Sequence, residues 1–223
     1  MGSGMSQRRE QVFGPGLELA SKLALGALLL LFPALVVFAL WRESVWQAIG
    51  EPIGQPIAFS HKHHVADDGI DCRYCHTTVE SEPRAGLPST RICMTCHSQL
   101  YRDAAVLAPL RESERSGRPL AWLRVHQLPG FVYFDHSVHL AKGVGCVECH
   151  GRVDQMPLTW RAQTLQMQWC LECHRDPAPR LRPHERLFDL AAPRLPEVEA
   201  RNQAARMQVE STRRLTDCST CHR

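Results

Sequence analysis

The sequence predicts a mainly α-helical chain with much irregular loop and one N-terminal transmembrane helix. An uncharged apolar run of nineteen residues, 23–41, lies near the N-terminus. The apolar runs that follow it are short, and the 14 Gly and 15 Pro of the chain fall often between them, which disfavours strands. Ten cysteines form five pairs of the type Cys-x-x-Cys, with none left over. We expect these pairs, rather than a conventional apolar core, to organise the fold.

The apolar run at residues 23–41 predicts a membrane-spanning helix, because nineteen residues at helical rise about cover a ~30 Å hydrocarbon core. The basic residues that precede the run are Arg8, Arg9 and Lys22. Charges nearly cancel just after the run, so the positive-inside rule places the N-terminus in the cytoplasm. We expect a cytoplasmic tail over 1–17, an anchor in the inner membrane over 18–42, and a periplasmic domain over 43–223.

A cleaved signal peptide is the alternative interpretation of this segment. Residues 37–39, Val-Phe-Ala, resemble a small-residue cleavage site after a basic start. However, the run exceeds the roughly 7–15 apolar residues of a signal peptide, and a long polar stretch precedes it. A retained, single-pass anchor is therefore favoured, and either interpretation exports the rest of the chain.

Each cysteine pair is followed at once by a histidine. We number these motifs 1 to 5: CRYCH at 72–76, CMTCH at 93–97, CVECH at 146–150, CLECH at 170–174 and CSTCH at 218–222. This is the attachment signature of c-type haem. Two thiols at this spacing add to the two vinyl groups of one porphyrin edge, and the adjacent imidazole binds the iron. The sequence predicts five covalently bound haem c groups.

The predicted attachment residues are the cysteines Cys72, Cys75, Cys93, Cys96, Cys146, Cys149, Cys170, Cys173, Cys218 and Cys221, and the proximal iron ligands are His76, His97, His150, His174 and His222. Zinc ribbons and disulfides also use paired cysteines. Neither requires a histidine in the next position, and histidine makes up only 12 of 223 residues. A histidine after all five pairs therefore favours haem.

The chain length fits porphyrins that replace a protein core. Some 180 residues follow the anchor, which leaves roughly 36 residues for each haem and too little chain for a conventional core around each one. We therefore expect short helices and loops packed on closely spaced haems.

The first four motifs belong to a duplicated module. The five motifs start at positions 72, 93, 146, 170 and 218, so short and long spacings alternate. The pattern F-x-H-x-x-H precedes motif 1 at residues 59–64 and motif 3 at residues 134–139. The two copies align at a nearly constant sequence offset. Phe59 aligns with Phe134, motif 1 with motif 3, and motif 2 with motif 4. The module, which carries two haems, spans about 59–97 and 134–174, and motif 5 is extra.

Histidines three residues apart lie on one side of a helical turn, yet they diverge enough to reach two different irons. This arrangement resembles the small multihaem class III cytochromes c. In that family the first histidine of F-x-H-x-x-H is the distal ligand of the haem attached just downstream. The resemblance implies that His61 pairs with His76. It implies in the same way that His136 pairs with His150.

The same resemblance implies that His64 and His139 cap two of the remaining haems. One distal ligand is then still needed, and we take His126 for it. The alternatives are the histidines His63 and His184 and the methionines Met156 and Met167. A methionine ligand would raise the reduction potential of its haem above that of the haems with two histidines.

An iron with two protein ligands has no open position for a small molecule, so the haems suit electron transfer rather than catalysis. The rest of the sequence offers no phosphate loop, no H-E-x-x-H motif and no persuasive nucleophile with a base. A multihaem enzyme with one open haem is the runner-up class. Because 26 Lys and Arg balance 23 Asp and Glu without a basic block, we do not expect nucleic acid as a partner.

Four longer strings carry a more specific resemblance: PIAFSHKHHVADDGIDCRYCH at 56–76, RVHQLPGFVYFDHSVHLAKGVGCVECHGRVDQM at 124–156, LQMQWCLECHR at 165–175 and LTDCSTCHR at 215–223. They resemble the membrane-anchored pentahaem subunit of bacterial alternative complex III. The resemblance implies an electron-carrier subunit, without catalytic residues of its own, in a complex that oxidises quinol. Its implied partners are an iron-sulfur subunit, multi-span quinol-binding subunits, and a periplasmic cytochrome c or haem-copper oxidase as acceptor.

Two other functions are weighed against this one. Solitary membrane-anchored quinol dehydrogenases, which feed periplasmic reductases, also combine one N-terminal helix with four or five haems. They oxidise quinol beside a first haem that lies close to the membrane, whereas motif 1 follows the anchor at a distance here. The third function is a general electron shuttle without a link to quinol.

Overall fold

A computed structural model describes residues 14–47 and 49–222 of the chain. The described chain forms two compact units, one on each side of residue 48. Most of the cytoplasmic tail expected at 1–17 lies outside the described residues, as do Arg8 and Arg9.

The N-terminal unit is the single helix α1 (Pro15–Gln47). Its segment Gly16–Trp41 has a mean hydropathy of 2.8, none of it is buried, and it is long and apolar enough to cross a membrane. Pro33 lies inside the helix without ending it. Lys22 forms an ion pair with Glu18 one turn earlier, at 2.5 Å. The helix extends beyond the expected bounds of 18–42 at both ends.

The second unit consists of short helices joined by irregular loops. Its helices are η1 (a π-helix, Lys62–Asp67), α2 (Cys72–Cys75), α3 (Thr90–His97), η2 (Ala105–Leu107), α4 (Ala108–Ser116), α5 (His136–Ala141), α6 (Val147–His150), η3 (Val153–Gln155), α7 (Met167–Arg175), η4 (Ala178–Arg180), η5 (His184–Arg186), α8 (Glu197–Arg206), α9 (Thr212–Leu215) and α10 (Cys218–Cys221). Between residues 49 and 222 the only β-structure is a set of isolated bridges. The expected fold class, mainly helical with irregular loops, is confirmed.

Each attachment motif forms one helical turn. In motif 1 the backbone N–H of His76 donates to the carbonyl of Cys72, at 2.9 Å. The same bond joins the ends of motifs 3 and 5, also at 2.9 Å. Aspartates cap two of these turns: Asp71 accepts from the backbone N–H of Arg73, and Asp217 accepts from that of Ser219. Both cysteines and the histidine of a motif therefore lie within one helical turn.

Apolar side chains form two small clusters instead of one large core. The first contains Ile57, Leu107 and Leu110, against which Cys93 of motif 2 packs. The second contains Val79, Leu140 and Leu187, against which Cys146 of motif 3 packs. Both clusters thus support a cysteine of an attachment motif, as expected of a unit built around covalent cofactors.

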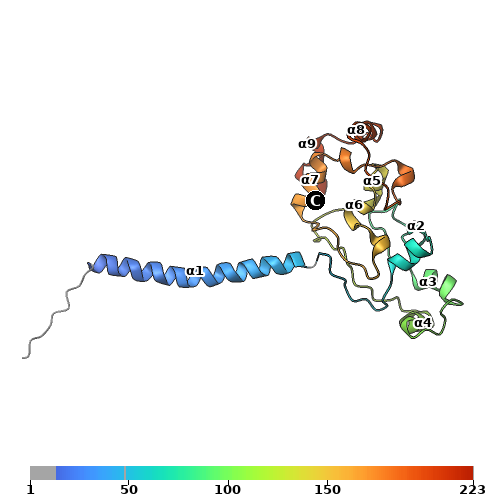
Figure 1. Ribbon diagram of the computed structural model, residues 1–223, viewed down its shortest axis with the longest axis horizontal. Coiled ribbons are helices and arrows are strands. Elements are labelled where there is room, and N and C mark those ends of the chain that lie inside the picture. The colour runs from blue at the N-terminus through green and yellow to red at the C-terminus, as the bar shows by residue number, and fades with distance from the viewer. Residues whose placement is uncertain (1–13, 48, 223) are drawn as a thin grey trace, which may run out of the picture. The chain divides into compact units, whose positions relative to one another are not determined.

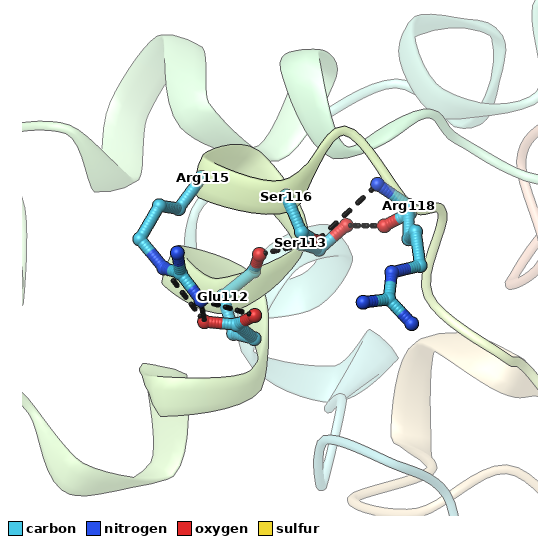
Figure 2. A network of polar contacts seen from close by, with 5 residues as sticks. All are labelled: Glu112, Ser113, Arg115, Ser116 and Arg118. Carbon is cyan, nitrogen blue, oxygen red and sulfur yellow. Dashed lines mark hydrogen bonds and ion pairs between the residues drawn. The ribbon is translucent and has the colours of Figure 1, made fainter.

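Helix α4 contacts the helix of motif 2 through Ser113, which belongs to a network of polar contacts within residues 112–118 that Figure 2 shows from close by. The hydroxyl of Ser113, which is 6% exposed, donates to the carbonyl of Arg118 at 2.5 Å. Because that bond uses its only hydrogen, Ser113 accepts from the hydroxyl of Thr90 in α3, at 2.6 Å. An ion pair of Arg115 with Glu112, at 2.7 Å, lies on the exposed side of the network. The bond between Thr90 and Ser113 joins α4 to α3.

Candidate functional site

The two F-x-H-x-x-H segments hold their histidines in the same way. In the first, the ring centroid of Phe59 lies 4.9 Å from that of His61, at 88°, and 4.5 Å from that of His64, at 24°. In the second copy, the corresponding values around Phe134 are 4.7 Å at 89° and 4.5 Å at 30°. The phenylalanine therefore fixes one histidine by its edge and the other by its face.

Three of these histidines face histidines of attachment motifs. The ring centroid of His64 lies 6.2 Å from that of His97. The centroids of His136 and His150 lie 6.3 Å apart, with their planes 15° from parallel. His139 and His174 lie 6.1 Å apart. The structure thus brings together His136 and His150, as expected, and it pairs the two histidines whose partners the sequence left open.

These spacings suit one iron between each pair of rings. A metal binds an imidazole nitrogen at about 2 Å, and that nitrogen lies about 1.1 Å from the ring centre, so two imidazoles on opposite sides of one metal have centroids about 6 Å apart. The three ring pairs match this value. Between residues 49 and 222, no group of three or more His, Cys, Asp and Glu residues is placed to hold a metal ion by itself. Paired ligands on two sides of a porphyrin fit this arrangement better than a tetrahedral zinc site.

His61 is the remaining histidine of the two segments, and its expected partner is His76. Burial lowers the pKa of His61 to about 4, and the nearby imidazole of His76 contributes to this lowering. The Nδ1 atom of His61 hydrogen-bonds the hydroxyl of Thr159 at 2.8 Å, and Nδ1 of His76 donates to the carbonyl of Gly86 at 2.8 Å. The nitrogens that remain for a metal are the Nε2 atoms of both rings.

Most of the histidines share this orientation. The Nδ1 atoms that donate to a backbone carbonyl are those of His64 (to Ser60), His76 (Gly86), His97 (Leu100), His136 (Pro83), His139 (Asp135), His174 (Leu215) and His222 (Phe131), over 2.6–3.1 Å. A neutral imidazole that donates from Nδ1 carries its lone pair on Nε2. Such second partners fix the tautomer and the ring plane of a metal ligand.

Burial keeps several of these rings neutral. It lowers the pKa of His150 to about 3, with smaller contributions from His126 and other neighbouring histidines. It also lowers the pKa of His139, although the carbonyl of Asp135 acts in the opposite direction. Because a metal binds only the unprotonated nitrogen, these shifts leave the donor atoms available at neutral pH.

No disulfide joins any of the ten cysteines, all of which lie in the described part of the chain. Burial raises the pKa of Cys146 to about 12, and burial has the same effect on Cys149. Neutral thiols grouped two residues apart beside a histidine are the donor set that covalent haem attachment requires. The residues present therefore fit haem c.

Motif 5 contacts the segment that precedes the second F-x-H-x-x-H. The backbone N–H of Tyr133 donates to the carbonyl of Cys221 at 2.8 Å. The ring centroid of Phe131 lies 5.8 Å from that of His222, and the planes are tilted by 31°. Phe131 is 64% exposed. This contact places motif 5 beside the second copy of the module.

His126 lies beside motif 3. Its ring centroid is 4.3 Å from that of His150, which is too short for two histidines that share one iron. Its Nε2 atom is buried and has no hydrogen-bond partner in the described chain. Burial lowers its pKa to about 4, and Arg161 is the next contributor.

The alternatives to His126 lie in different surroundings. His63 is exposed, with its ring nitrogens 3.8 Å and 3.6 Å from the carboxylates of Asp67 and Asp68. His184 is exposed at the start of η5. Met156 is 2% exposed in the interior, whereas Met167 is 66% exposed at the start of α7.

One feature of motif 3 is not readable from the sequence. Glu148, between its two cysteines, is 6% exposed and receives charged hydrogen bonds from Arg182 at 3.4 Å and Arg194 at 3.0 Å. Arg182 is itself 4% exposed and donates to the carbonyl of Ala192 at 2.7 Å. This ion pair ties motif 3 to the C-terminal segment.

Comparison with known proteins agrees with this site. Residues 57–110 and 132–223 match the family described as cytochrome c7 and related cytochrome c, which is more than half of the chain. A curated relative is the multihaem cytochrome c subunit of menaquinone reductase from Nitratidesulfovibrio vulgaris (strain Hildenborough). It is 38% identical over 125 residues, which are 56% of this chain and 53% of the relative. The chain thus spans about half the length of this relative. With its repeated attachment motifs and paired histidines, the chain belongs to the family of cytochrome c7 and related cytochromes c.

Proposed function

We propose that the chain is an electron-transfer subunit with five haem c groups, one at each motif. Haem c supplies reversible one-electron chemistry at its iron when bound. The chain contributes the thiols that attach each group and the imidazoles that hold the iron from both sides. On this proposal the chain has no catalytic residues, because no side chain acts on a substrate.

The observation that carries this proposal is the pairing of histidines. Three motif histidines each face a second histidine at 6.1–6.3 Å between ring centroids. An iron held between such rings has both axial positions filled by protein, which suits electron transfer and leaves no position for oxygen, nitrite or sulfite. For motif 1 we propose the same ligation by His61 and His76.

We propose further that α1 anchors the chain in the inner membrane and that the haem unit lies in the periplasm. The length and hydropathy of Gly16–Trp41 support an anchor. The basic residues before the apolar run favour a cytoplasmic N-terminus. Covalent haem attachment, which takes place outside the cytoplasm, is consistent with this orientation.

The partners follow from the resemblance to the pentahaem subunit of alternative complex III. We propose an iron-sulfur subunit and multi-span quinol-binding subunits in the membrane, with a periplasmic cytochrome c or haem-copper oxidase as acceptor. The relative in N. vulgaris is named as a subunit of a menaquinone reductase, which supports a membrane complex linked to the quinone pool.

Purification of the full chain from its own membranes in mild detergent tests this proposal. We expect an iron-sulfur subunit and multi-span subunits to remain bound, as identified by mass spectrometry. A chain that purifies alone and is reduced directly by a quinol analogue would contradict the proposal. That result would support the solitary quinol dehydrogenase instead.

The name of the relative favours a second candidate, in which the same complex reduces quinone. The direction of electron flow does not change the role of this chain, because it carries electrons either way. The two candidates differ in a measurement on the purified complex. Quinol oxidation predicts haem reduction on addition of a quinol analogue, whereas quinone reduction predicts oxidation of pre-reduced haems by a quinone analogue.

For the fifth distal ligand we propose His126, whose Nε2 atom is buried without a hydrogen-bond partner in the described chain. Motifs 1 to 4 have their proposed second histidines, so the iron it would serve is that of motif 5, although its ring lies beside His150 of motif 3. Substitution His126→Ala is expected to open one iron, seen as binding of one carbon monoxide per reduced chain. The matched control is His63→Ala, which removes an exposed imidazole and is expected to bind none. A His126→Ala chain that binds no carbon monoxide contradicts this assignment.

A further inference from the structure

The five attachment motifs do not lie in space in the order of the chain. Motifs 1 and 2 are direct neighbours: the hydroxyl of Tyr74 in motif 1 hydrogen-bonds that of Thr95 in motif 2, at 2.9 Å. Both residues stand between the two cysteines of their motif. The short helix η1 supplies His64 to motif 2.

Motif 1 also adjoins motif 3, through a shared support in the C-terminal segment. The backbone N–H of Cys146 in motif 3 donates to the carbonyl of Leu187, at 3.2 Å. The next residue, Phe188, lies under the guanidinium of Arg73 in motif 1, 4.5 Å from its ring centroid. In addition, the loop after motif 1 offers the carbonyl of Pro83 to Nδ1 of His136, which faces motif 3.

Motif 3 is followed in space by motif 4. Helix α5 presents His136 to His150 of motif 3 and His139 to His174 of motif 4. Histidines three residues apart on one helix hold their two motifs within a short distance of each other. Motifs 3 and 4 of the second copy are therefore neighbours, as motifs 1 and 2 are in the first copy.

Motif 4 is joined in turn to motif 5. Nδ1 of His174 donates to the carbonyl of Leu215, at 2.8 Å, and Leu215 ends the helix α9 just before motif 5. The hydroxyl of Thr212 in the same helix donates to the carbonyl of Arg175, which follows motif 4, at 3.1 Å. In Figure 1, α3, α2, α6 and α7 follow one another across the unit and the C-terminus lies beside α7.

The exposure of the cysteines agrees with this spatial order of the motifs. Cys96 of motif 2 and Cys218 of motif 5 are exposed, whereas the other eight attachment cysteines are partly buried. The two exposed cysteines belong to the motifs at the two ends. The motifs between them are shielded by their neighbours.

We infer that the haems form one linear wire in the order 2–1–3–4–5, so that electrons enter and leave through the haems of motifs 2 and 5. The inference rests on the proposed function, since it assumes a haem at every motif. An electron passing between the first and the second copy of the module crosses from motif 1 to motif 3. It does not cross from motif 2 to motif 3, although these follow each other in the chain.

Oriented electrochemistry of the full chain in detergent tests this order. All ten native cysteines are consumed by haem, so one added cysteine gives a unique thiol for attachment to a gold electrode. Gln99→Cys places it beside motif 2, and Arg213→Cys places it before motif 5; both positions are exposed. In each parent chain we expect fast exchange of five electrons, counted by coulometry.

The haem of motif 1 is then removed by the double substitution Cys72→Ser and Cys75→Ser. We expect one electron to exchange fast from the thiol at 99, because motif 2 is then isolated, and three from the thiol at 213. A wire in chain order would leave motifs 2 to 5 connected, so four fast electrons from either thiol would overturn the inference. A pyridine haemochrome assay that gives four haems per chain verifies that only one group was lost.

A second measurement guards against a variant that fails to fold. Anomalous diffraction at the iron edge, from crystals of the unsubstituted full chain, locates the five irons. We expect the irons of motifs 2 and 5 to be the most distant pair and those of motifs 1 and 3 to be nearest neighbours. An iron of motif 1 at one end overturns the inference. Neither experiment needs the partner subunits, so failure of the order and failure of the proposed complex are distinguishable.

Discussion

The two copies of the module reach the same arrangement of histidine rings from different backbones. The phenylalanine lies 4.9 Å and 4.5 Å from its two histidine rings in the first copy, and 4.7 Å and 4.5 Å from them in the second. Yet the first copy carries its histidines at a π-helix, η1, and the second carries them on an α-helix, α5. The arrangement of the histidine rings is therefore retained, whereas the helix type is not.

One inserted residue explains this difference. From the phenylalanine to the first cysteine of its motif, the first copy (59 to 72) is one residue longer than the second (134 to 146). In the second copy, the N–H of Val144 donates to the carbonyl of His139, five residues earlier; in the first, the N–H of Ile70 donates to that of His64, six residues earlier. A π-helical turn takes one more residue than an α-helical turn and absorbs the insertion after the second histidine.

The copies also differ in how their first motif is held. Tyr74 and Glu148 occupy the same position in motifs 1 and 3, yet Tyr74 is 49% exposed and Glu148 is 6% exposed. Tyr74 bonds a neighbouring motif, whereas Glu148 is paired with the buried Arg182. The side chain at this position thus bonds a neighbouring motif in the first copy and the C-terminal segment in the second.

The largest effect is expected from breaking the ion pair of the second copy. Arg182→Met leaves the buried carboxylate of Glu148 without its buried partner, and we expect the free energy of unfolding to fall by about 3 kcal/mol. Guanidinium denaturation followed by far-UV circular dichroism measures this change. Adding Glu148→Gln to Arg182→Met removes the buried charge, which would otherwise be left with only the exposed Arg194, and is expected to recover part of the loss.

The matched control in the first copy is Tyr74→Phe, which deletes one exposed hydrogen bond and is expected to cost about 0.5 kcal/mol. An equal loss of unfolding free energy for Arg182→Met and Tyr74→Phe would show that the two copies are held alike. That outcome would contradict the difference between the buried ion pair of the second copy and the exposed hydrogen bond of the first.

A smaller effect is expected at a pair of equivalent glycines. Gly69 and Gly143 both have positive φ, +70° and +86°. An added Cβ at Gly69 meets nothing within 4 Å, whereas at Gly143 it would lie 2.9 Å from the carbonyl oxygen of Arg182. We expect Gly69→Ala to destabilise by about 1 kcal/mol, through its backbone alone, and Gly143→Ala by about 2 kcal/mol or more. Denaturation of both variants under the same conditions tests the ranking, and it is contradicted if Gly69→Ala is the more damaging.

The smallest effect is expected from deletion of Ala66 in η1. The shortened first copy has the length of the second, so its π-helix can become an α-helix without moving His64. We expect all haems to remain low-spin in the electron paramagnetic resonance spectrum. Deletion of Ala141 from α5 is the comparison, because the second copy has no residue to spare, and we expect it to convert one haem to the high-spin state. High-spin haem in the Ala66 deletion would show that the extra residue is needed.

The sequence predicted much of this molecule because haem attachment is encoded locally. Five C-x-x-C-H motifs, each a single helical turn, and the apolar run before them led to a mainly helical fold, which is confirmed. The membership in a multihaem cytochrome family agrees with that prediction. The iron ligands themselves remain predictions, although the structure brings His136 to His150 as expected.

Other features depend on contacts between distant segments and were not predictable. The partners of His64 and His139 lie far from them in the chain, at His97 and His174. The burial of Glu148 arises from Arg182, and the same motif position holds an exposed tyrosine in the first copy. The unequal lengths of the two copies reveal an inserted residue, but only the hydrogen bonds after His64 locate it. The spatial order of the motifs likewise follows from long-range bonds such as that between motif 4 and α9.

We propose that every iron is closed on both sides, so that the chain carries electrons and binds no substrate. Exposure of the fully reduced full chain to carbon monoxide tests this proposal. We expect an unchanged Soret spectrum, with no carbon monoxide bound. A difference spectrum equivalent to one haem per chain would reveal an open iron and support a multihaem enzyme instead of a carrier.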